Sequence, residues 1–205
     1  MTTNAVFWNK AARGYAKRPV ADEAAYAHTL DRTRSYLKAT DKVLEAGCGT
    51  GTTALKLADA AGEIVATDVA SEMIAIAREK GKDAAKVRFE VADETLKPFD
   101  ADTFDAVLAF NLIHLVPNPP NALRRFHDVL KPGGFFISKT PCLGGSVVLK
   151  PIIRVMQFVG KAPFVSFLRP DDVANMVERA GLEIVERANH NKGTRGHFIV
   201  ARKPL

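Results

Sequence analysis

The chain has 205 residues, of which 47% are hydrophobic and 25% charged, and its formal net charge is +6. This composition is typical of a globular protein and excludes a disordered or collagen-like chain. The modest positive charge permits an anionic partner without requiring one. The two cysteines, Cys48 and Cys142, are too few and too far apart for a disulfide framework or a cysteine-only zinc site. Together with the lack of a signal-peptide core near the N-terminus, they predict a reducing, cytoplasmic location and no metal site.

Helices and strands are predicted to alternate along the first two thirds of the chain. The alanine-rich and charged residues 20–38 predict a helix, and further helices are expected at 51–62, 71–81 and 120–134. Ser71 is the expected N-cap of the third of these helices, and Gly81 its end. Short apolar runs predict strands at 42–47, 63–70, 86–93, 104–113 and 135–140. This alternation predicts a parallel sheet with helices on both faces.

The pattern changes after residue 141. An irregular apolar segment, 142–168, precedes a predicted helix at 169–181, which we expect Asp171 or a neighbour to cap and Gly181 to end. Residues 182–189 and 196–203 alternate apolar and polar side chains and predict a closing antiparallel hairpin. We therefore expect a single domain, 1–205, with a helical cap (1–40), a core (41–140), an apolar insert or lid (141–168) and a closing helix and hairpin (169–205).

The stretch VLEAGCGTG, residues 43–51, joins a predicted strand to a predicted helix through three alternating glycines. Ligands of doubly wound sheets bind at the carboxyl ends of the strands, where this loop lies. A dinucleotide-binding loop has the spacing Gly-x-Gly-x-x-Gly, but Thr52 occupies the position of its third glycine. A dinucleotide-dependent oxidoreductase is therefore kept only as an alternative.

The run from Glu45 to Gly51, Glu-Ala-Gly-Cys-Gly-Thr-Gly, resembles the first motif of class I S-adenosylmethionine-dependent methyltransferases. The resemblance extends over about residues 40–140 and includes Asp68 with Ser71 and Met73 in "DVASEM", Asp93 in "EVADETLKPF", "FDAVLAFNLIHLV" and "VLKPGGFFIS". It implies a Rossmann-like sheet of seven strands, mostly parallel with an antiparallel C-terminal hairpin, and S-adenosylmethionine as cofactor. More loosely, the chain resembles the small methyltransferases of the type 11 and quinone-biosynthesis group.

The resemblance also implies a set of cofactor-binding residues. Asp68 corresponds to the ribose-binding carboxylate, Asp93 to the acceptor for the adenine amino group, and Asn111 is a further candidate for the cofactor's amino group. The complete predicted set is Glu45, Gly47, Cys48, Gly49, Gly51, Asp68, Val69, Met73, Ala92, Asp93 and Asn111.

The candidate for a catalytic residue is His114, which follows the fourth predicted strand and has a side chain suited to act as a base near neutral pH. Methyl transfer needs a base only when the acceptor arrives protonated, so His114 could instead pack against the cofactor. Nucleic acid is not an expected substrate. The Asp/Asn-Pro-Pro-aromatic run of DNA amino-methylating enzymes is missing after residue 110, and Cys142 lacks the partner cysteine of RNA cytosine-C5 enzymes.

The expected acceptor-binding residues lie in the N-terminal segment and in the apolar insert: Trp8, Tyr15, Phe158 and Phe164. A helix over 151–161 would place Arg154, Gln157 and Lys161 on one face and apolar residues on the rest. Such a helix could form a lid, cap the core, touch a membrane surface or form a homodimer contact. The sequence thus predicts methyl transfer to a small, lipophilic molecule, with a non-catalytic cofactor-binding subunit as a further alternative.

Overall fold

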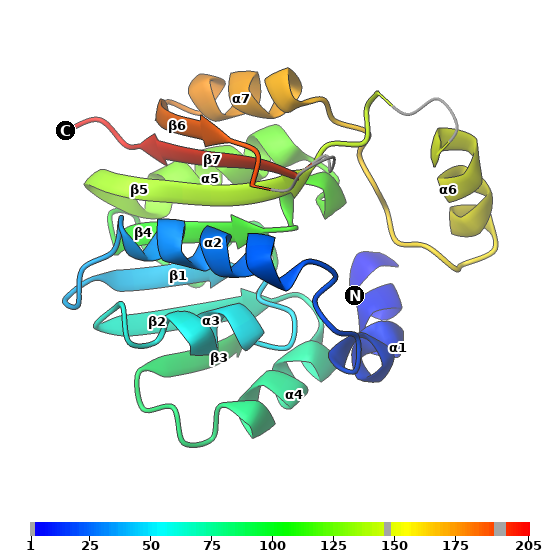
Figure 1. Ribbon diagram of the computed structural model, residues 1–205, viewed down its shortest axis with the longest axis horizontal. Coiled ribbons are helices and arrows are strands. Elements are labelled where there is room, and N and C mark those ends of the chain that lie inside the picture. Colours follow the sequence, from blue (N-terminus) through cyan, green and yellow to red (C-terminus); the bar gives the residue numbers. More distant parts are fainter. Residues whose placement is uncertain (1–2, 146–148, 191–195) are drawn as a thin grey trace.

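The computed structural model, which describes residues 3–145, 149–190 and 196–205, is built around one seven-stranded sheet (Figure 1). The strand order is β3-β2-β1-β4-β5-β7-β6. Neighbours from β3 to β5 are parallel, whereas β7 is antiparallel to both β5 and β6. This confirms the predicted fold class, including the antiparallel C-terminal strands. The strands are β1 Lys42–Ala46, β2 Glu63–Asp68, β3 Val87–Val91, β4 Phe104–Phe110, β5 Leu130–Pro141, β6 Glu183–Ala188 and β7 Gly196–Arg202.

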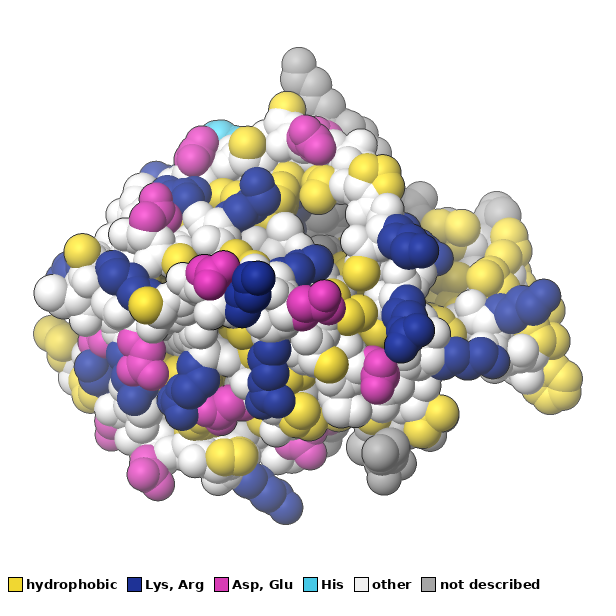
Figure 2. Space-filling model, turned by 90° about the horizontal axis from the view of Figure 1, so that it is seen from below, with side chains coloured by type: hydrophobic (Ala, Val, Ile, Leu, Met, Phe, Trp, Pro, Cys, Tyr) yellow, Lys and Arg dark blue, Asp and Glu magenta, His cyan; other side chains and the backbone are white. Residues whose placement is uncertain are grey.

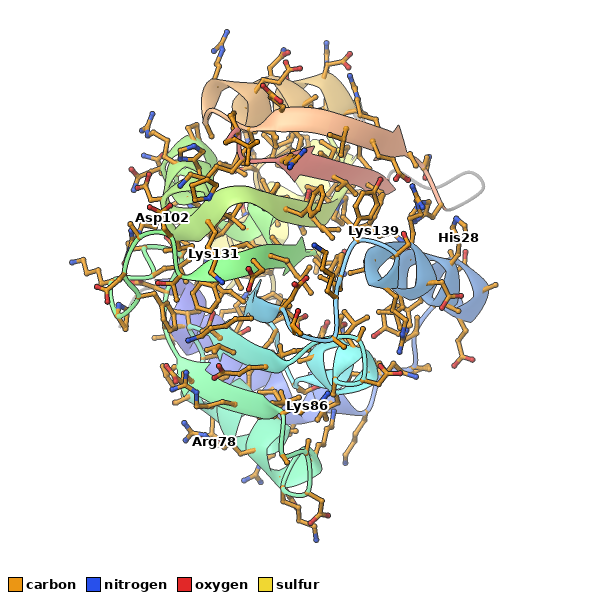
Figure 3. All side chains as sticks on the ribbon, turned by 90° about the vertical axis from the view of Figure 1, so that its left-hand side faces the viewer. His28, Arg78, Lys86, Asp102, Lys131 and Lys139 are labelled. Carbon is orange, nitrogen blue, oxygen red and sulfur yellow. The ribbon has the colours of Figure 1, made fainter. Side chains whose placement is uncertain are left out.

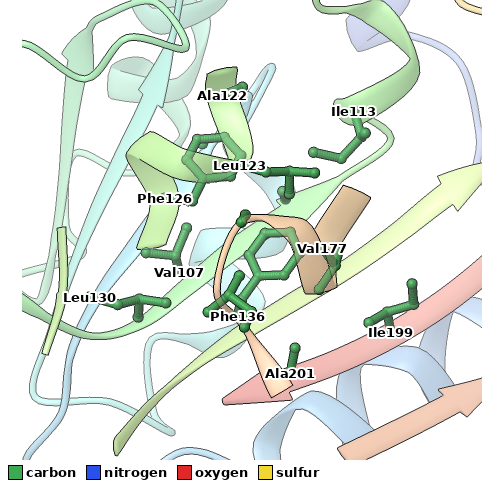
Figure 4. Close-up of a cluster of buried hydrophobic side chains, with 14 of the residues drawn as sticks. Val107, Ile113, Ala122, Leu123, Phe126, Leu130, Phe136, Val177, Ile199 and Ala201 are labelled. Atoms are coloured by element: carbon green, nitrogen blue, oxygen red, sulfur yellow. The ribbon is translucent and has the colours of Figure 1, made fainter. Parts of the chain in front are cut away.

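Helices cover both faces of the sheet, as expected for strands that are apolar on both sides. One face carries α2 Glu23–Arg34, α3 Thr52–Leu57 and α4 Ser71–Lys80, and the other carries α5 Pro119–Val129 and α7 Pro170–Arg179. Successive strand residues alternate between the two cores: Phe136 packs with α5 and α7, and Ile137 with α2 and α3. Figure 4 shows the first of these cores, where Phe126 and Phe136 stack with ring centroids 5.9 Å apart.

Two helices lie outside these layers, near the carboxyl ends of the strands: α1 Thr3–Ala16 and α6 Leu149–Phe158 (Figure 1). Ala12 of α1 is buried against Ala70 and Met73, so α1 is docked on the start of α4. No residue of α6 is buried. Within the described part of the chain, no helix combines the length and apolarity needed to cross a membrane.

The opposite edge of the sheet, at the amino ends of the parallel strands, is held by ion pairs. Lys131 Nζ lies 2.8 Å from Asp105 Oδ1, and Lys203 Nζ lies 2.8 Å from Asp102 Oδ1. Figure 3 looks onto this edge and labels Lys131 and Asp102. The fold therefore leaves the carboxyl edge, with the glycine-rich loop, as the place for a ligand.

Several predicted helix boundaries are wrong: the helix expected at 20–38 spans only Glu23–Arg34, and three further differences have visible structural causes. The N-cap of α4 is Ala70 rather than Ser71, and Asn9 Oδ1 of α1 accepts from the backbone N of Glu72 at 2.9 Å. The helix expected at 51–62 ends at Leu57, because the chain returns to the sheet where the N–H of Gly62 bonds to the carbonyl of Asp41. The helix expected at 120–134 ends at Val129, and the Pro-Gly-Gly run enters an irregular start of β5.

Candidate functional site

The glycine-rich loop connects β1 to α3, and each of its three glycines has a positive φ: +71° at Gly47, +55° at Gly49 and +75° at Gly51. A β-carbon at Gly51 would lie 2.6 Å from the Phe89 ring, and one at Gly47 would lie 2.7 Å from Leu112 Cδ1. At Gly49 it would meet only Tyr15, at 3.7 Å. Packing therefore requires a glycine at Gly51, where the Phe89 ring and Ala77 stand in the way. At Gly47 the obstacle is the end of the Leu112 side chain, and at Gly49 the missing side chain leaves open space.

Asp68 ends β2 beside this loop and is held by two backbone amides. The N–H of Gly49 donates to Oδ2 and the N–H of Ala70 donates to Oδ1, both at 2.9 Å. Burial raises the pKa of the Asp68 carboxyl, and these amides oppose the rise. Since each carboxylate oxygen can accept two hydrogen bonds, each keeps capacity for a ligand hydroxyl.

The ends of β3 and β4 bring two further polar side chains to the same place. The backbone N of Ala92 donates to the Asp68 carbonyl at 3.1 Å, which sets the chain just before Asp93 beside β2. Asp93 Oδ1 accepts from the backbone N and the hydroxyl of Thr95. Asn111 has a φ of +54°, a left-handed conformation that turns the chain sharply after β4. The carboxyl ends of β2, β3 and β4 thus supply polar groups to one site, with the glycine-rich loop of β1 between β2 and β4.

These groups line a cavity of about 620 Å³, within the range of ordinary small-molecule sites. Its remaining wall comes from α1, η1 (Ile113–Leu115) with its flanks, and the segment after α6. The lining residues are Asn4, Trp8, Tyr15, Ala46, Gly47, Gly49, Thr67, Asp68, Val69, Ala92, Asp93, Glu94, Phe110, Asn111, Leu112, Leu115, Val116, Pro117 and Phe164.

The cavity brings together most of the predicted site. The predicted residues that line it are Gly47, Gly49, Asp68, Val69, Ala92, Asp93, Asn111, Trp8, Tyr15 and Phe164. The predicted residues outside the lining are Glu45, Cys48, Gly51, Met73, His114 and Phe158. The first four of these are buried or lie under the loop, His114 is buried beside the wall, and Phe158 is exposed on α6.

Glu45 lies behind the loop, fully enclosed. Its Oε2 has no hydrogen-bond partner among the described residues, although the amide of Ala54 donates to its carboxyl group. Burial raises its pKa to about 8, and the negative charge of Asp68 adds to the rise. Near neutral pH this carboxyl is therefore largely protonated. The same burial raises the pKa of Cys48, so its thiol is neutral.

His114 lies in η1, next to the cavity wall. It is buried, its Nδ1 has no partner among the described residues, and desolvation lowers its pKa to about 4. Its backbone carbonyl accepts from the N–H of Ser166 at 2.7 Å, which ties η1 to the segment after α6. The imidazole is neutral at pH 7, and its role as a base stays a prediction.

Asn4 also lines the cavity, although no motif in the sequence singled it out. Its Nδ2 donates to the Leu115 carbonyl at 2.7 Å, and its Oδ1 accepts from the N–H of Phe164 at 3.3 Å. One side chain therefore joins α1, η1 and the segment after α6 across the cavity. Trp8 and Tyr15, also on α1, meet edge to face with ring centroids 5.8 Å apart. No local motif could point to Asn4, because its partners, Leu115 and Phe164, are distant in the sequence.

Among the described residues, the structure supports neither a nucleophilic cysteine nor a metal site. Cys142 is buried, its Sγ lies 3.5 Å from the Thr140 carbonyl, and burial raises its pKa to about 11, so it is not an activated nucleophile. In the described ranges, no three His, Cys, Asp or Glu residues are grouped so that they could hold a metal ion.

The part of the chain that carries the polar residues of this cavity matches a known family. A family model described as a methyltransferase domain matches residues 43–134, which run from β1 into β5. The chain is 28% identical over 157 residues to the ubiquinone biosynthesis O-methyltransferase of Ruegeria pomeroyi, covering 71% of this chain and 61% of that protein. It thus spans about three fifths of the length of such curated relatives.

The name of another relative describes a different activity. The chain is 26% identical over 185 residues to the mitochondrial arginine-hydroxylase NDUFAF5 of Danio rerio, covering 87% of this chain and 56% of that protein. Among solved structures, the complex between the Haloferax volcanii Trm112 methyltransferase activator and the putative methyltransferase matches with a TM-score of 0.80 and 18% identity, covering 97% of this chain and 98% of the matched one. The last likeness establishes the fold alone, and the hydroxylase name means that the reaction must be argued from the site.

Proposed function

We propose that this chain, which belongs to the class I S-adenosylmethionine-dependent methyltransferases, transfers a methyl group from S-adenosylmethionine to a small, lipophilic acceptor. The observation that carries the proposal is one cavity with two unlike walls. Bare loop backbone and the carboxylates of Asp68 and Asp93 form one wall, and aromatic and aliphatic side chains form the other.

The polar wall fits the cofactor of this family. The free acceptor capacity of Asp68 suits the two ribose hydroxyls, and Asp93 and the backbone around Ala92 suit the adenine ring. The open space at Gly49 lets the ligand approach the backbone closely. Asn111, which lines the cavity after β4, would bind the amino-acid end. Glu45, behind the loop, would act through the loop rather than by lining the cavity.

The second wall fits an acceptor without a negative charge. Trp8, Leu115, Val116 and Phe164 supply apolar surface, and the described lining contains no Lys, Arg or His to pair with an anion. Burial and the nearby charge of Asp68 raise the pKa of Tyr15, so its phenol stays protonated and can donate a hydrogen bond. A neutral ring or chain with one polar atom is the acceptor class that this wall favours.

Methyl transfer requires little of the protein beyond aligning the acceptor atom with the methyl group of the cofactor. When bound, S-adenosylmethionine supplies an electrophilic methyl group on a sulfonium, and displacement at that carbon is in line. The α1 helix and the Phe164 segment would hold the acceptor against the polar wall and exclude water. The neutral imidazole of His114, beside this wall, could take a proton from the acceptor only after a side-chain movement brought it into the cavity.

Calorimetry with the purified chain tests the cofactor site. We expect S-adenosylmethionine and its demethylated product to bind, and NAD not to bind. Asp68→Ala should weaken binding by about 1.5–3 kcal/mol, because it removes hydrogen bonds to a charged group. Asp83→Ala, which alters an exposed carboxylate outside the cavity, should leave affinity unchanged. Equal affinity in wild-type and Asp68→Ala protein would remove Asp68 from the site.

Turnover separates an enzyme from a cofactor-binding subunit. Transfer of a labelled methyl group should occur to neutral lipophilic phenols or quinols and not to matched acceptors that carry a carboxylate. Binding of the cofactor without transfer to any member of the panel would favour the non-catalytic alternative. Reduction of NAD in place of methyl transfer would favour the oxidoreductase.

A further inference from the structure

The helix α6 turns its apolar side away from the protein. Ile152, Val155 and Val159 are spaced three and four residues apart and share one side, with 49%, 63% and 55% of their surfaces exposed, and Phe158 beside them is 92% exposed. The inner side is held by Gln157, whose Nε2 donates to the Pro163 carbonyl at 2.8 Å. A surface helix of a globular protein normally has the reverse orientation, with apolar residues inward.

The chain's positive charge is concentrated around this helix and α1. Residues 1–21 and 141–170 together contain eight Lys and Arg residues and no Asp or Glu, whereas the rest of the chain contains 21 basic and 23 acidic residues. At the right of Figure 2, where α6 projects from the body, the side chains are hydrophobic or basic and no acidic side chain is seen. Lys150 and Arg154 lie on α6 itself, both exposed.

We propose that α6 binds the surface of an anionic lipid membrane. An amphipathic helix with basic residues beside an apolar stripe lies in the interface, with its apolar side among the acyl chains and its cations at the headgroups. Each Lys or Arg near an anionic surface strengthens this attraction. The ten residues of α6 are far too short to span a bilayer, so only surface binding fits.

Charge complementarity favours a lipid surface over a second copy of this chain. In a two-fold dimer the same patch faces itself, so α6 would bring its basic residues toward those of its partner, with no acidic residue in residues 141–170 to oppose them. An anionic membrane satisfies the charge and buries the exposed apolar stripe at the same time.

The location of α6 agrees with this partner. α6 and α1 both lie at the carboxyl edge of the sheet (Figure 1), and the segment that follows α6 carries Phe164 into the cavity wall. A membrane-bound α6 would thus place the cavity near the lipid. The inference does not require methyl transfer, because it concerns a surface outside the cavity.

Vesicle co-sedimentation of the full chain tests the proposal. We expect binding to vesicles that contain phosphatidylglycerol in phosphatidylcholine, little binding to pure phosphatidylcholine, and weaker binding as salt increases. No binding to the anionic vesicles at low salt would overturn the proposal, whatever the outcome of the cofactor experiments.

Two double variants with matched controls test whether α6 is the surface that binds the vesicles. Lys150→Glu with Arg154→Glu should weaken partitioning at least about tenfold, whereas Lys38→Glu with Lys82→Glu, which changes net charge equally, should have a much smaller effect. Val155→Glu with Phe158→Glu should also weaken it about tenfold or more, and Val185→Glu, at an exposed valine on β6, should not. All these sites are exposed, so circular dichroism should show unchanged folding.

Two results would contradict the assignment to α6. Equal losses in the α6 variants and their controls would mean that binding depends on net charge alone. A dimer seen by light scattering without lipid, and converted to monomer by Val155→Glu with Phe158→Glu, would show that a second copy covers this face.

Discussion

At the scale of single residues, the three glycines of the loop have one conformation in common but differ in what surrounds them. Gly49→Val should abolish cofactor binding, because the new side chain would fill the space that Gly49 leaves open. Gly51→Val should mainly destabilise the fold, because its β-carbon would overlap the Phe89 ring and Ala77. Calorimetry and thermal denaturation of both variants measure the two effects separately.

The comparison controls for backbone strain, since both positions have a positive φ and a β-branched residue is strained at each. The extra loss of stability in Gly51→Val therefore reports packing. Intact cofactor binding by a folded Gly49→Val protein would mean that the loop does not touch the ligand.

His114 should make stability depend on pH. Burial lowers its folded-state pKa to about 4, while the unfolded chain has the ordinary value near 6.5. Between these values the unfolded state binds more protons, so this histidine's contribution is present above pH 6.5 and is lost as the pH falls toward 4. The loss is about 3.5 kcal/mol at most, given about 1.4 kcal/mol for each pKa unit.

Urea unfolding of the wild type and of His114→Gln at several pH values measures this contribution. The difference in free energy of unfolding between the two proteins should shrink as the pH falls from 7 to 4.5, because glutamine does not titrate. A difference that stays constant over this range would show that His114 does not have a depressed pKa in the folded protein.

The sequence predicted which residues line the cavity better than it predicted the burial and the protonation states of Glu45 and His114. Asp68 and Gly49 belong to a local pattern in which strand end, turn and helix start are all encoded within a few residues. The elevated pKa of Glu45 and the isolation of His114 arise from burial by segments that are distant in the sequence. No local pattern contains that information, so the motif could not show that Glu45 and His114 lie outside the lining.

At the scale of elements, the side chain of Asn4 ties α1 to the other two segments of the cavity's outer wall. Without it, α1 loses its side-chain hydrogen bonds to η1 and to the Phe164 segment, while the bond from Ser166 to the His114 carbonyl still joins these two. Trypsin should cut after Arg154 and Lys161 in the free protein, and more slowly when cofactor product and a lipophilic acceptor are bound. Asn4→Ala should remove much of this ligand-induced protection, and electrophoresis of the fragments measures it.

Asn121→Ala, at an exposed position on α5, is the matched control and should keep the protection. Equal cleavage with and without ligands in the wild type would show that residues 142–168 do not act as a cover. Val147 and Val148, which belong to the predicted insert, lie outside the described residues, so the experiment concerns the segment from Leu149 onward.

Element types were predictable where hydrophobic periodicity was strong, and element ends were not. Every strand was predicted in its correct order because alternate residues enter two different cores, as at Phe136 and Ile137, although β5 begins at Leu130 rather than at residue 135. The start of α4 was wrong because the helix begins one residue earlier, where Asn9, more than sixty residues away, accepts from the backbone N of Glu72. The outward orientation of the apolar side of α6 could not be predicted from the sequence either, because an amphipathic pattern does not say which side packs against the protein.

At the scale of the whole molecule, one sheet runs through the structure, and both of its faces carry continuous cores. We therefore expect the chain to unfold as one domain. Differential scanning calorimetry should show one transition with an enthalpy of about 140 kcal/mol, from about 0.7 kcal/mol per residue near 60 °C, and equal calorimetric and van't Hoff enthalpies.

The same calorimetric measurement, made with the cofactor product bound, tests whether the cofactor site belongs to this single domain. A ligand at 100 times its dissociation constant stabilises the folded state by about 2.7 kcal/mol, which should raise the midpoint by about 5–11 °C for a domain of this size. Because α1 lines the cavity and is docked on α4, the whole transition should move without splitting. A separate early transition that alone responds to the demethylated cofactor would mean that α1 and its neighbours unfold independently of the sheet, and the single-domain prediction would fail.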